Sequence, residues 1–259
     1  MEYRDIVKIY IFFNFIYIYM VYIVLYPIFY IPLAIINRFR NNPEPQSNKI
    51  TKKILKHFNC EIVHINNNKI IDSGFILANH RCSFDFIFDP HISKSSIVGR
   101  YKAVLSTFFL SVLSFIERRL IPMQRTFNRN FIFDKIKNHI EYDFKDFDSN
   151  CFNKRITYYP EGTRLNYTSI DSIDVVKSLL KHGLIKSIYE YKKLPVQIIL
   201  TKNKEKVYNE ITLDVGYDVK LPVYISKEIN PADFNEYNDF YDYICNEWYN
   251  AFNMLYKND

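Results

Sequence analysis

A long uncharged apolar segment near the N-terminus constrains the fold of this chain more than any other feature. Residues 9–36 read IYIFFNFIYIYMVYIVLYPIFYIPLAII, and no charged side chain lies between Lys8 and Arg38. A helix needs roughly 20 apolar residues to cross a bilayer, so this segment is long enough for a membrane span. A secretory signal peptide has a shorter apolar part and a small-residue cleavage site, so it fits poorly. The segment therefore predicts a membrane anchor within residues 1–40.

Two prolines and the flanking charges refine this prediction. Pro27 and Pro32 are expected to break or kink a single helix, so we predict either one tilted membrane helix or a bent helical hairpin. More Lys and Arg side chains follow the segment than precede it, which places the rest of the chain on the cytoplasmic side. Residues 41–259 form the second predicted unit, a cytoplasmic-facing domain at the endoplasmic reticulum or another internal membrane.

The glycines, cysteines and charges exclude several function classes. The chain has 5 glycines, all far apart, so neither a Gly-x-Gly-x-x-Gly fingerprint nor a P-loop occurs. Its 4 cysteines form no Cys-x-x-Cys pair, which excludes a zinc ribbon and indicates free thiols in a reducing compartment. The formal net charge of +6 favours anionic head groups or phosphorylated substrates. This charge is spread along the chain, so no nucleic-acid partner is expected.

Helix-like and strand-like blocks alternate beyond residue 50, as is typical of an α/β domain. We predict a layered mixed sheet flanked by helices. The expected strands lie at residues 60–65, 74–78, 155–159, 194–200 and 210–216. The expected helices lie at residues 51–58, 103–116, 131–144, 172–182 and 233–256, and a further helix starts near residue 83.

A histidine and an aspartate follow the short apolar strand expected at residues 74–78. Residues 79–85 read NHRCSFD, and we expect Asn79 to cap the helix that follows. Two residues five positions apart lie ~140° apart on a regular helix, so His80 must lie in the preceding turn if its ring is to meet Asp85. In that arrangement the carboxylate would orient the imidazole and favour its charged form. The alternative is a helix cap with a solvent-facing histidine.

A second polar turn follows the strand expected at residues 155–159. Residues 158–164 read YYPEGTR, in which proline and glycine make a fixed turn. Thr163 and Arg164 present a hydroxyl beside a guanidinium, and arginine is suited to bidentate phosphate binding. Burial of Glu161 requires a partner, so we expect it to orient an arginine or a substrate hydroxyl. Considered alone, such a turn is more often structural.

Together the two segments resemble the glycerolipid acyltransferase family, which includes 1-acylglycerol-3-phosphate and lysophospholipid acyltransferases. The signatures of that family, Asn-His-x-x-x-x-Asp and Pro-Glu-Gly-Thr-Arg, are both intact here. Residues 115–119, FIERR, match its intermediate block, and residues 194–196, LPV, match its later apolar-proline block. Residues 79–81 and 159–166 look closest to the lysocardiolipin-type branch.

The resemblance implies a membrane-bound acyltransferase that moves a fatty acyl group from acyl-CoA to the free hydroxyl of a lysophospholipid. The expected acceptor is 1-acylglycerol-3-phosphate, which gives phosphatidic acid. It implies His80 as the general base, oriented by Asp85. The implied substrate-binding residues are Asn79, Arg118, Glu161, Gly162, Thr163 and Arg164.

The same resemblance implies membrane lipids as the partners, acyl-CoA as a co-substrate, and neither a cofactor nor a catalytic metal. In agreement, the carboxylates and histidines of residues 80–91 lack a clear metal-ligand spacing. Two alternatives remain open: an enzyme that remodels lysocardiolipin or lysophosphatidylinositol, and a catalytically silent lipid-binding membrane protein. The sequence does not indicate an oligomeric state.

Overall fold

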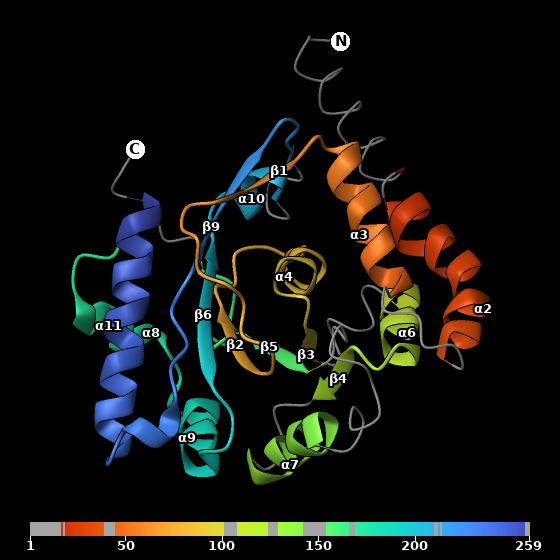
Figure 1. Ribbon diagram of the computed structural model, residues 1–259. Helices are drawn as coiled ribbons and strands as arrows, with labels where there is room; N and C mark the ends of the chain where they lie inside the picture. The colour runs from red at the N-terminus through yellow and green to blue at the C-terminus, as the bar shows by residue number, and fades with distance from the viewer. Residues whose placement is uncertain are drawn as a thin grey trace.

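A sheet of seven strands lies at the centre of the molecule (Figure 1). The computed structural model describes residues 17, 19–38, 45–100, 108–123, 129–141, 154–165, 169–209, 212 and 214–256. The order of the strands is β1-β9-β6-β2-β5-β3-β4. Their bounds are β1 (Glu61–His64), β2 (Gly74–Ala78), β3 (Ser96–Arg100), β4 (Leu120–Met123), β5 (Arg155–Tyr158), β6 (Val196–Thr201) and β9 (Lys220–Ile225).

The strands of this sheet run in two directions. β6, β2, β5, β3 and β4 are parallel to one another. β9 is antiparallel to β6, and β1 is parallel to β9. The predicted mixed sheet of an α/β domain is therefore confirmed. A second, two-stranded sheet consists of β7 (Tyr208–Asn209) and β8 (Asp214–Val215).

Helices cover both faces of the large sheet. One face carries α7 (Arg129–Glu141), α8 (Ile173–Leu179), α9 (His182–Tyr191) and α11 (Tyr237–Tyr256), with the short helix η2 (Pro231–Asp233) before α11. The other face carries α3 (Gln46–His57), α4 (Asp85–Ser93), α6 (Phe108–Ile116) and α10 (Lys204–Val207).

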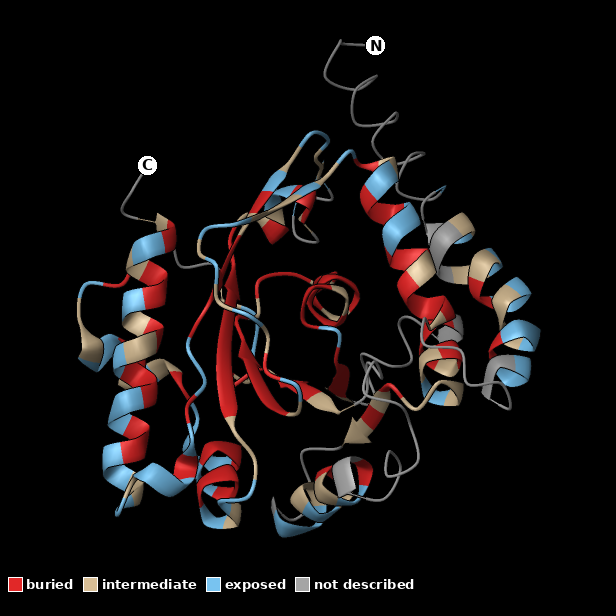
Figure 2. Cartoon of the chain, in the orientation of Figure 1, coloured by how far each residue is buried: buried red, intermediate tan, exposed pale blue. Residues whose placement is uncertain are grey.

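The central strands are apolar along their whole length because both of their faces are buried. In β2, Phe75 and Leu77 pack into the first helical layer, whereas Ile76 packs into the second. A strand covered on both faces reads as a continuous apolar run rather than an alternating one. Figure 2 shows the central strands and α4 as the most buried part of the chain.

The N-terminal helices pack against the domain. η1 (Tyr19–Leu25) and α2 (Tyr26–Arg38) contact α6, and α2 also contacts α3. Within the described ranges, no helix has both the length and the apolar character needed to cross a membrane. α2 contains Pro27 and continues through Pro32, so neither proline interrupts this helix. Residues 1–16, 18, 39 and 40 of the predicted anchor lie outside the described residues.

The helix expected at residues 172–182 is two helices. The chain is extended at Leu180 and Lys181, and α9 starts at His182, so Gly183 lies inside a helix rather than after one. Tertiary hydrogen bonds explain the interruption: Lys181 N–H donates to the Pro160 carbonyl at 2.8 Å, and Tyr241 Oη–H donates to the Leu180 carbonyl at 2.9 Å. Packing therefore overrides local helix propensity here.

Candidate active site

The two polar segments predicted from the sequence meet at the carboxyl ends of neighbouring strands. β2 and β5 are paired in parallel, so the turns that follow them leave the same edge of the sheet. His80 N–H donates to Glu161 Oε2 at 2.5 Å, and Leu165 N–H donates to the His80 carbonyl at 3.0 Å. Arg81 Nη1 donates to the Leu165 carbonyl at 3.0 Å. Direct hydrogen bonds thus join segments about eighty residues apart into one site.

His80 and Asp85 form a hydrogen-bonded pair in the first segment. His80 Nδ1 lies 2.7 Å from Asp85 Oδ2, because His80 occupies the turn before α4 and Asp85 is the first residue of that helix. The backbone N–H groups of Arg81 and Cys82 also donate to Asp85 Oδ2. An ionised carboxylate only accepts hydrogen bonds, so Nδ1 carries the proton and Nε2 is the ring nitrogen able to accept one.

Burial and neighbouring charges act in opposite directions on Asp85. Burial by itself would raise the pKa of Asp85, but the ammonium of Lys204, the His80 ring and the N–H of Arg81 favour the charged form. The pKa of Asp85 consequently lies below its ordinary value. The carboxylate is therefore ionised in the pH range in which His80 would act as a base.

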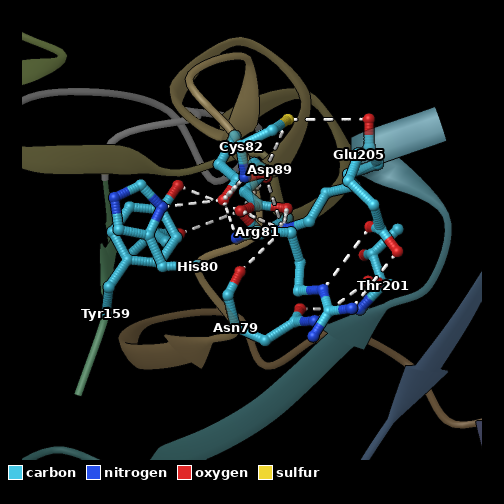
Figure 3. Close-up of polar contacts among 12 residues, drawn as sticks. Asn79, His80, Arg81, Cys82, Asp89, Tyr159, Thr201 and Glu205 are labelled. Carbon is cyan, nitrogen blue, oxygen red and sulfur yellow. Dashed lines mark hydrogen bonds and ion pairs between the residues drawn. The ribbon is translucent and has the colours of Figure 1, made fainter. Parts of the chain in front are cut away.

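An aromatic ring fixes the plane of the imidazole. The rings of His80 and Tyr159 are stacked with centroids 4.5 Å apart and planes 18° apart (Figure 3). The His80 side chain keeps an exposed fraction of 16%. Among the described residues, its Nε2 makes no hydrogen bond. The ring is thus oriented by protein groups on one nitrogen and on one face.

Asn79 has a different place from the one expected. It does not cap α4, whose N-cap position is Phe84. Its side-chain amide instead pairs with the backbone of Thr201: Nδ2 donates to the carbonyl at 3.0 Å, and Oδ1 accepts from the N–H at 2.9 Å. These bonds extend the pairing of β2 with β6 beyond Ala78 and Ile199, where the backbone of β2 turns away. Asn79 therefore holds the turn that carries His80.

The second segment forms a tight turn around a buried carboxylate. Gly162 has a φ of +71°, which a residue without a side chain adopts most easily. Glu161 is buried, whereas Thr163 and Arg164 are exposed beside it. Leu165, which follows Arg164 in the chain, donates its N–H to the His80 carbonyl. Arg164 is therefore one residue away from a direct contact of His80.

Arg118 lies at the amino ends of the parallel strands, whereas His80 lies beyond their carboxyl ends. Strand registers place Leu120, the first residue of β4, level with Ile76 of β2. Arg118 precedes that level, while His80 follows it by four residues. The structure therefore does not bring Arg118 to His80. Its neighbour Arg119 is buried and donates to the carbonyls of Pro90 and Ser95 and to Ser47 Oγ.

Two buried charged residues near the pair were missed by the sequence reasoning. Lys204 Nζ lies 3.3 Å from Asp85 Oδ1 and 2.8 Å from Asp89 Oδ2. Residues 201–206, TKNKEK, look like a solvated polar stretch, so nothing local marks Lys204 as buried. One signal was available: Asp85 and Asp89 are one helical turn apart, with only apolar residues between them. Two carboxylates on one buried face require a cation.

Metal-ligating side chains and the thiol of Cys82 are the other groups to consider in this region. Within the part of the chain that the structure describes, no group of three His, Cys, Asp or Glu side chains is placed to hold a metal ion. Burial raises the pKa of Cys82 well above its ordinary value, and the Asp85 carboxylate adds to this effect. Cys82 is therefore a neutral thiol, which is a poor nucleophile.

Comparison with protein-family models and with curated protein sequences gives no match. Among solved structures, the chain is similar to the crystal structure of the 1-acyl-sn-glycerophosphate (LPA) acyltransferase PlsC from Thermotoga maritima. The TM-score is 0.67, the sequence identity is 16%, and the match covers 97% of each chain. The chain therefore shares the fold of that LPA acyltransferase, a mixed α/β sheet flanked by helices.

Proposed function

We propose that this protein is an acyltransferase that transfers a fatty acyl group from acyl-CoA to the free hydroxyl of a lysophospholipid. The observation that carries the proposal is the His80–Asp85 pair at the carboxyl ends of the strands, in which Nε2 makes no hydrogen bond to any residue that the structure describes. The fold shared with an LPA acyltransferase supports the same reaction class. We propose 1-acylglycerol-3-phosphate as the acceptor and phosphatidic acid as the product.

The proposed reaction needs one general base and no covalent enzyme intermediate. An alcohol has a pKa far above 7, so it must lose its proton as it attacks. Nε2 of His80 accepts the hydroxyl proton while the oxygen bonds to the thioester carbonyl carbon, and Asp85 stabilises the resulting imidazolium. The tetrahedral intermediate then collapses: the carbon–sulfur bond breaks, and the CoA thiolate leaves with the proton from Nε2.

The exposed residues next to the histidine supply the proposed acceptor contacts. Arg164 carries a guanidinium that matches the geometry of a phosphate, and Thr163 adds a hydroxyl beside it. The bond from Leu165 N–H to the His80 carbonyl sets the position of this turn relative to the base. Correct placement of an acceptor hydroxyl lowers the barrier by several kcal/mol in general.

We further propose that the N-terminal helices rest in one leaflet of the membrane that supplies the lipid substrates. Their outward side is apolar, and Phe29 of α2 is 71% exposed. Figure 2 shows much of this side of α2 as exposed. The large apolar side chains exposed here are Met20, Leu25, Ile28, Phe29, Leu33, Ile35 and Ile36, together with Phe115 of α6. Such a surface favours an interfacial position.

The experiment is an assay of CoA thiol release with purified protein, acyl-CoA and a panel of lysophospholipids in vesicles. We expect His80→Ala to lower kcat/KM by about 10²–10⁴-fold because the general base is lost. His64→Ala, on an exposed histidine of β1, is the matched control and should retain activity. Near wild-type transfer by His80→Ala would disprove the mechanism. Arg164→Ala should raise the Michaelis constant for phosphorylated acceptors, and Arg164→Lys should raise it less.

The same panel separates the competing functions. Transfer only to lysocardiolipin or lysophosphatidylinositol would identify a remodelling enzyme. Repeating the panel with an acyl carrier protein thioester tests the donor: transfer only from this thioester would change the donor and keep the reaction. Vesicle binding without any transfer would indicate a silent lipid-binding protein.

Co-sedimentation with phosphatidylcholine and phosphatidylglycerol vesicles tests the membrane surface. Phe29→Asp should weaken binding, because it places a charge on the surface proposed to contact acyl chains. Phe131→Asp, on an exposed phenylalanine of α7, is the control and should bind as wild type does. Equal binding by wild type and Phe29→Asp would exclude this surface.

A further inference from the structure

A lysine with no exposed surface lies behind the proposed catalytic pair. Lys204 starts α10, directly after Asn203, which has a φ of +68°. This turn directs the Lys204 side chain inward, where Nζ donates to the Asn79 carbonyl at 2.7 Å and to Asp89 Oδ1 at 3.0 Å. Its ammonium also lies 3.3 Å from Asp85 Oδ1. All of these acceptors belong to the segment that carries the pair.

The contacts of this lysine close a ring around the histidine. Lys204 binds Asp89, and Tyr159 Oη–H donates to Asp89 Oδ2 at 2.9 Å. The Tyr159 ring stacks on the His80 ring, and His80 is hydrogen-bonded to Asp85. Asp85 forms an ion pair with Lys204, which closes the ring of contacts. The ring joins the end of β5, the turn after β2, α4 and α10. Displacement of any one member would therefore disturb the next.

Burial of the Lys204 ammonium is unfavourable unless nearby negative charges compensate for the lost hydration. Removing an ammonium from water has a penalty of several kcal/mol, which only close counter-charges offset. Burial raises the pKa of Asp89 to about 7, with Asp85 acting in the same direction and Lys204 opposing both. Burial lowers the pKa of Lys204, but the two carboxylates outweigh this effect and raise it above its ordinary value. The ammonium is therefore charged throughout the neutral range.

We propose that Lys204 is a positioning residue for the base, which holds Asp85 Oδ1 so that Oδ2 faces Nδ1 of His80. The inference rests on the proposed function in one respect, that the pair accepts a proton from the substrate. The ammonium has a second effect, because a nearby cation opposes the uptake of a proton by the pair. Loss of Lys204 must then change the pH at which the pair becomes protonated, and not only the activity.

Other charged and titratable groups near the ring must stay unchanged for this test to be clean. They are Arg81 and Cys82 of the turn, Glu161 after β5, Glu205 of α10 and Tyr256 of α11. Arg81 and Glu205 form an ion pair at 3.2 Å. Cys82 and Tyr256 are neutral, since burial raises the pKa of each. The variants below alter none of these five residues.

The test compares the pH dependence of kcat/KM in wild type and three variants. Lys204→Met removes the cation, so the pair takes up a proton more easily and the acidic limb should move up by on the order of one pH unit. Asp89→Asn removes a negative charge from the same ring only while Asp89 is ionised, so the limb should move down, by less than Lys204→Met moves it up. Lys206→Met, on an exposed lysine of α10, is the matched control and should leave the profile unchanged.

A double variant covers the case in which Lys204→Met fails to fold. Lys204→Met with Asp89→Asn removes the ammonium together with the carboxyl group that it binds, so the acidic limb should lie between those of the single variants. Circular dichroism and thermal unfolding identify misfolded proteins. An acidic limb that stays at the wild-type pH in folded Lys204→Met, or a double variant whose limb lies at the same pH as that of Asp89→Asn, would overturn the proposal and leave Lys204 a structural residue.

NMR titration of the His80 ring, assigned by loss of its signal in His80→Gln, gives a readout that needs no substrate. The midpoint should move up in Lys204→Met, down in Asp89→Asn, and not at all in Lys206→Met. An inactive wild-type protein that still shows these shifts would refute the proposed function and support the role of Lys204. An active protein that lacks these shifts would support the proposed function and refute the role of Lys204.

Discussion

Replacing Asp85 with asparagine removes the negative charge of the pair while keeping its shape. In the structure, Asp85 Oδ2 accepts hydrogen bonds from His80 Nδ1 and from the N–H groups of Arg81 and Cys82. An asparagine keeps these bonds only with its oxygen in that position, which turns its NH2 group toward the ammonium of Lys204. The opposite orientation would place NH2 against three donors. The first orientation should therefore prevail, with the histidine still in the correct tautomer.

The size of the effect follows from the lost charge. Two unit charges with centres roughly 4 Å apart attract by about 4 kcal/mol at an effective dielectric constant of ~20. This attraction exists only while His80 is an imidazolium, so its loss raises the barrier and leaves substrate binding nearly unchanged. Since ~1.4 kcal/mol corresponds to a factor of ten in rate, Asp85→Asn should lower kcat by about 10³-fold.

Steady-state kinetics on CoA release measures this change, and the matched variant is Asp89→Asn. Asp89 lies one turn further along α4 and does not contact the His80 ring, so its loss should lower kcat by less than about tenfold. Losses of equal size in the two variants would refute the reasoning, because the effect would then come from the buried network as a whole. An unchanged kcat in Asp85→Asn would remove the carboxylate from the mechanism.

Stability measurements by urea unfolding test two further parts of the fold. A methyl group at Gly74 would lie 2.3 Å from the Pro195 carbonyl oxygen, so Gly74→Ala should lose about 3 kcal/mol or more of unfolding free energy. Gly162→Ala should lose about 1–2 kcal/mol from its positive φ alone, and Gly183→Ala, in a helix with open space, should gain about 0.5–1 kcal/mol. A different rank order would contradict this interpretation. Asn79→Leu leaves the buried backbone groups of Thr201 unpaired and should lose about 2–5 kcal/mol, whereas an unchanged unfolding midpoint would show that these bonds are replaced.

Several strands were not predicted from the sequence because the segments that form them are short. β3, β4 and β9 are strands of four to six residues, and no prediction covered them. Strands buried in a sheet lack the alternation that marks a half-exposed strand, and Pro222 lies inside β9. The interruption between α8 and α9 at residues 180–181 depends on hydrogen bonds to Pro160 and to Tyr241 of α11. No local sequence pattern contains these contacts.

The sequence by itself determined the strand at residues 74–78, the turn that places His80 before Asp85, and the second turn at residues 160–164. These features depend on local chemistry: an apolar run, a spacing incompatible with one helical face, and a proline-glycine turn. Only the tertiary structure decided that Asn79 pairs with Thr201 and that Arg118 lies at the opposite end of the strands from His80. It also decided that Lys204 is buried behind the His80–Asp85 pair. Strand register and burial arise from contacts between distant segments, and a residue's own neighbours in the chain do not specify them.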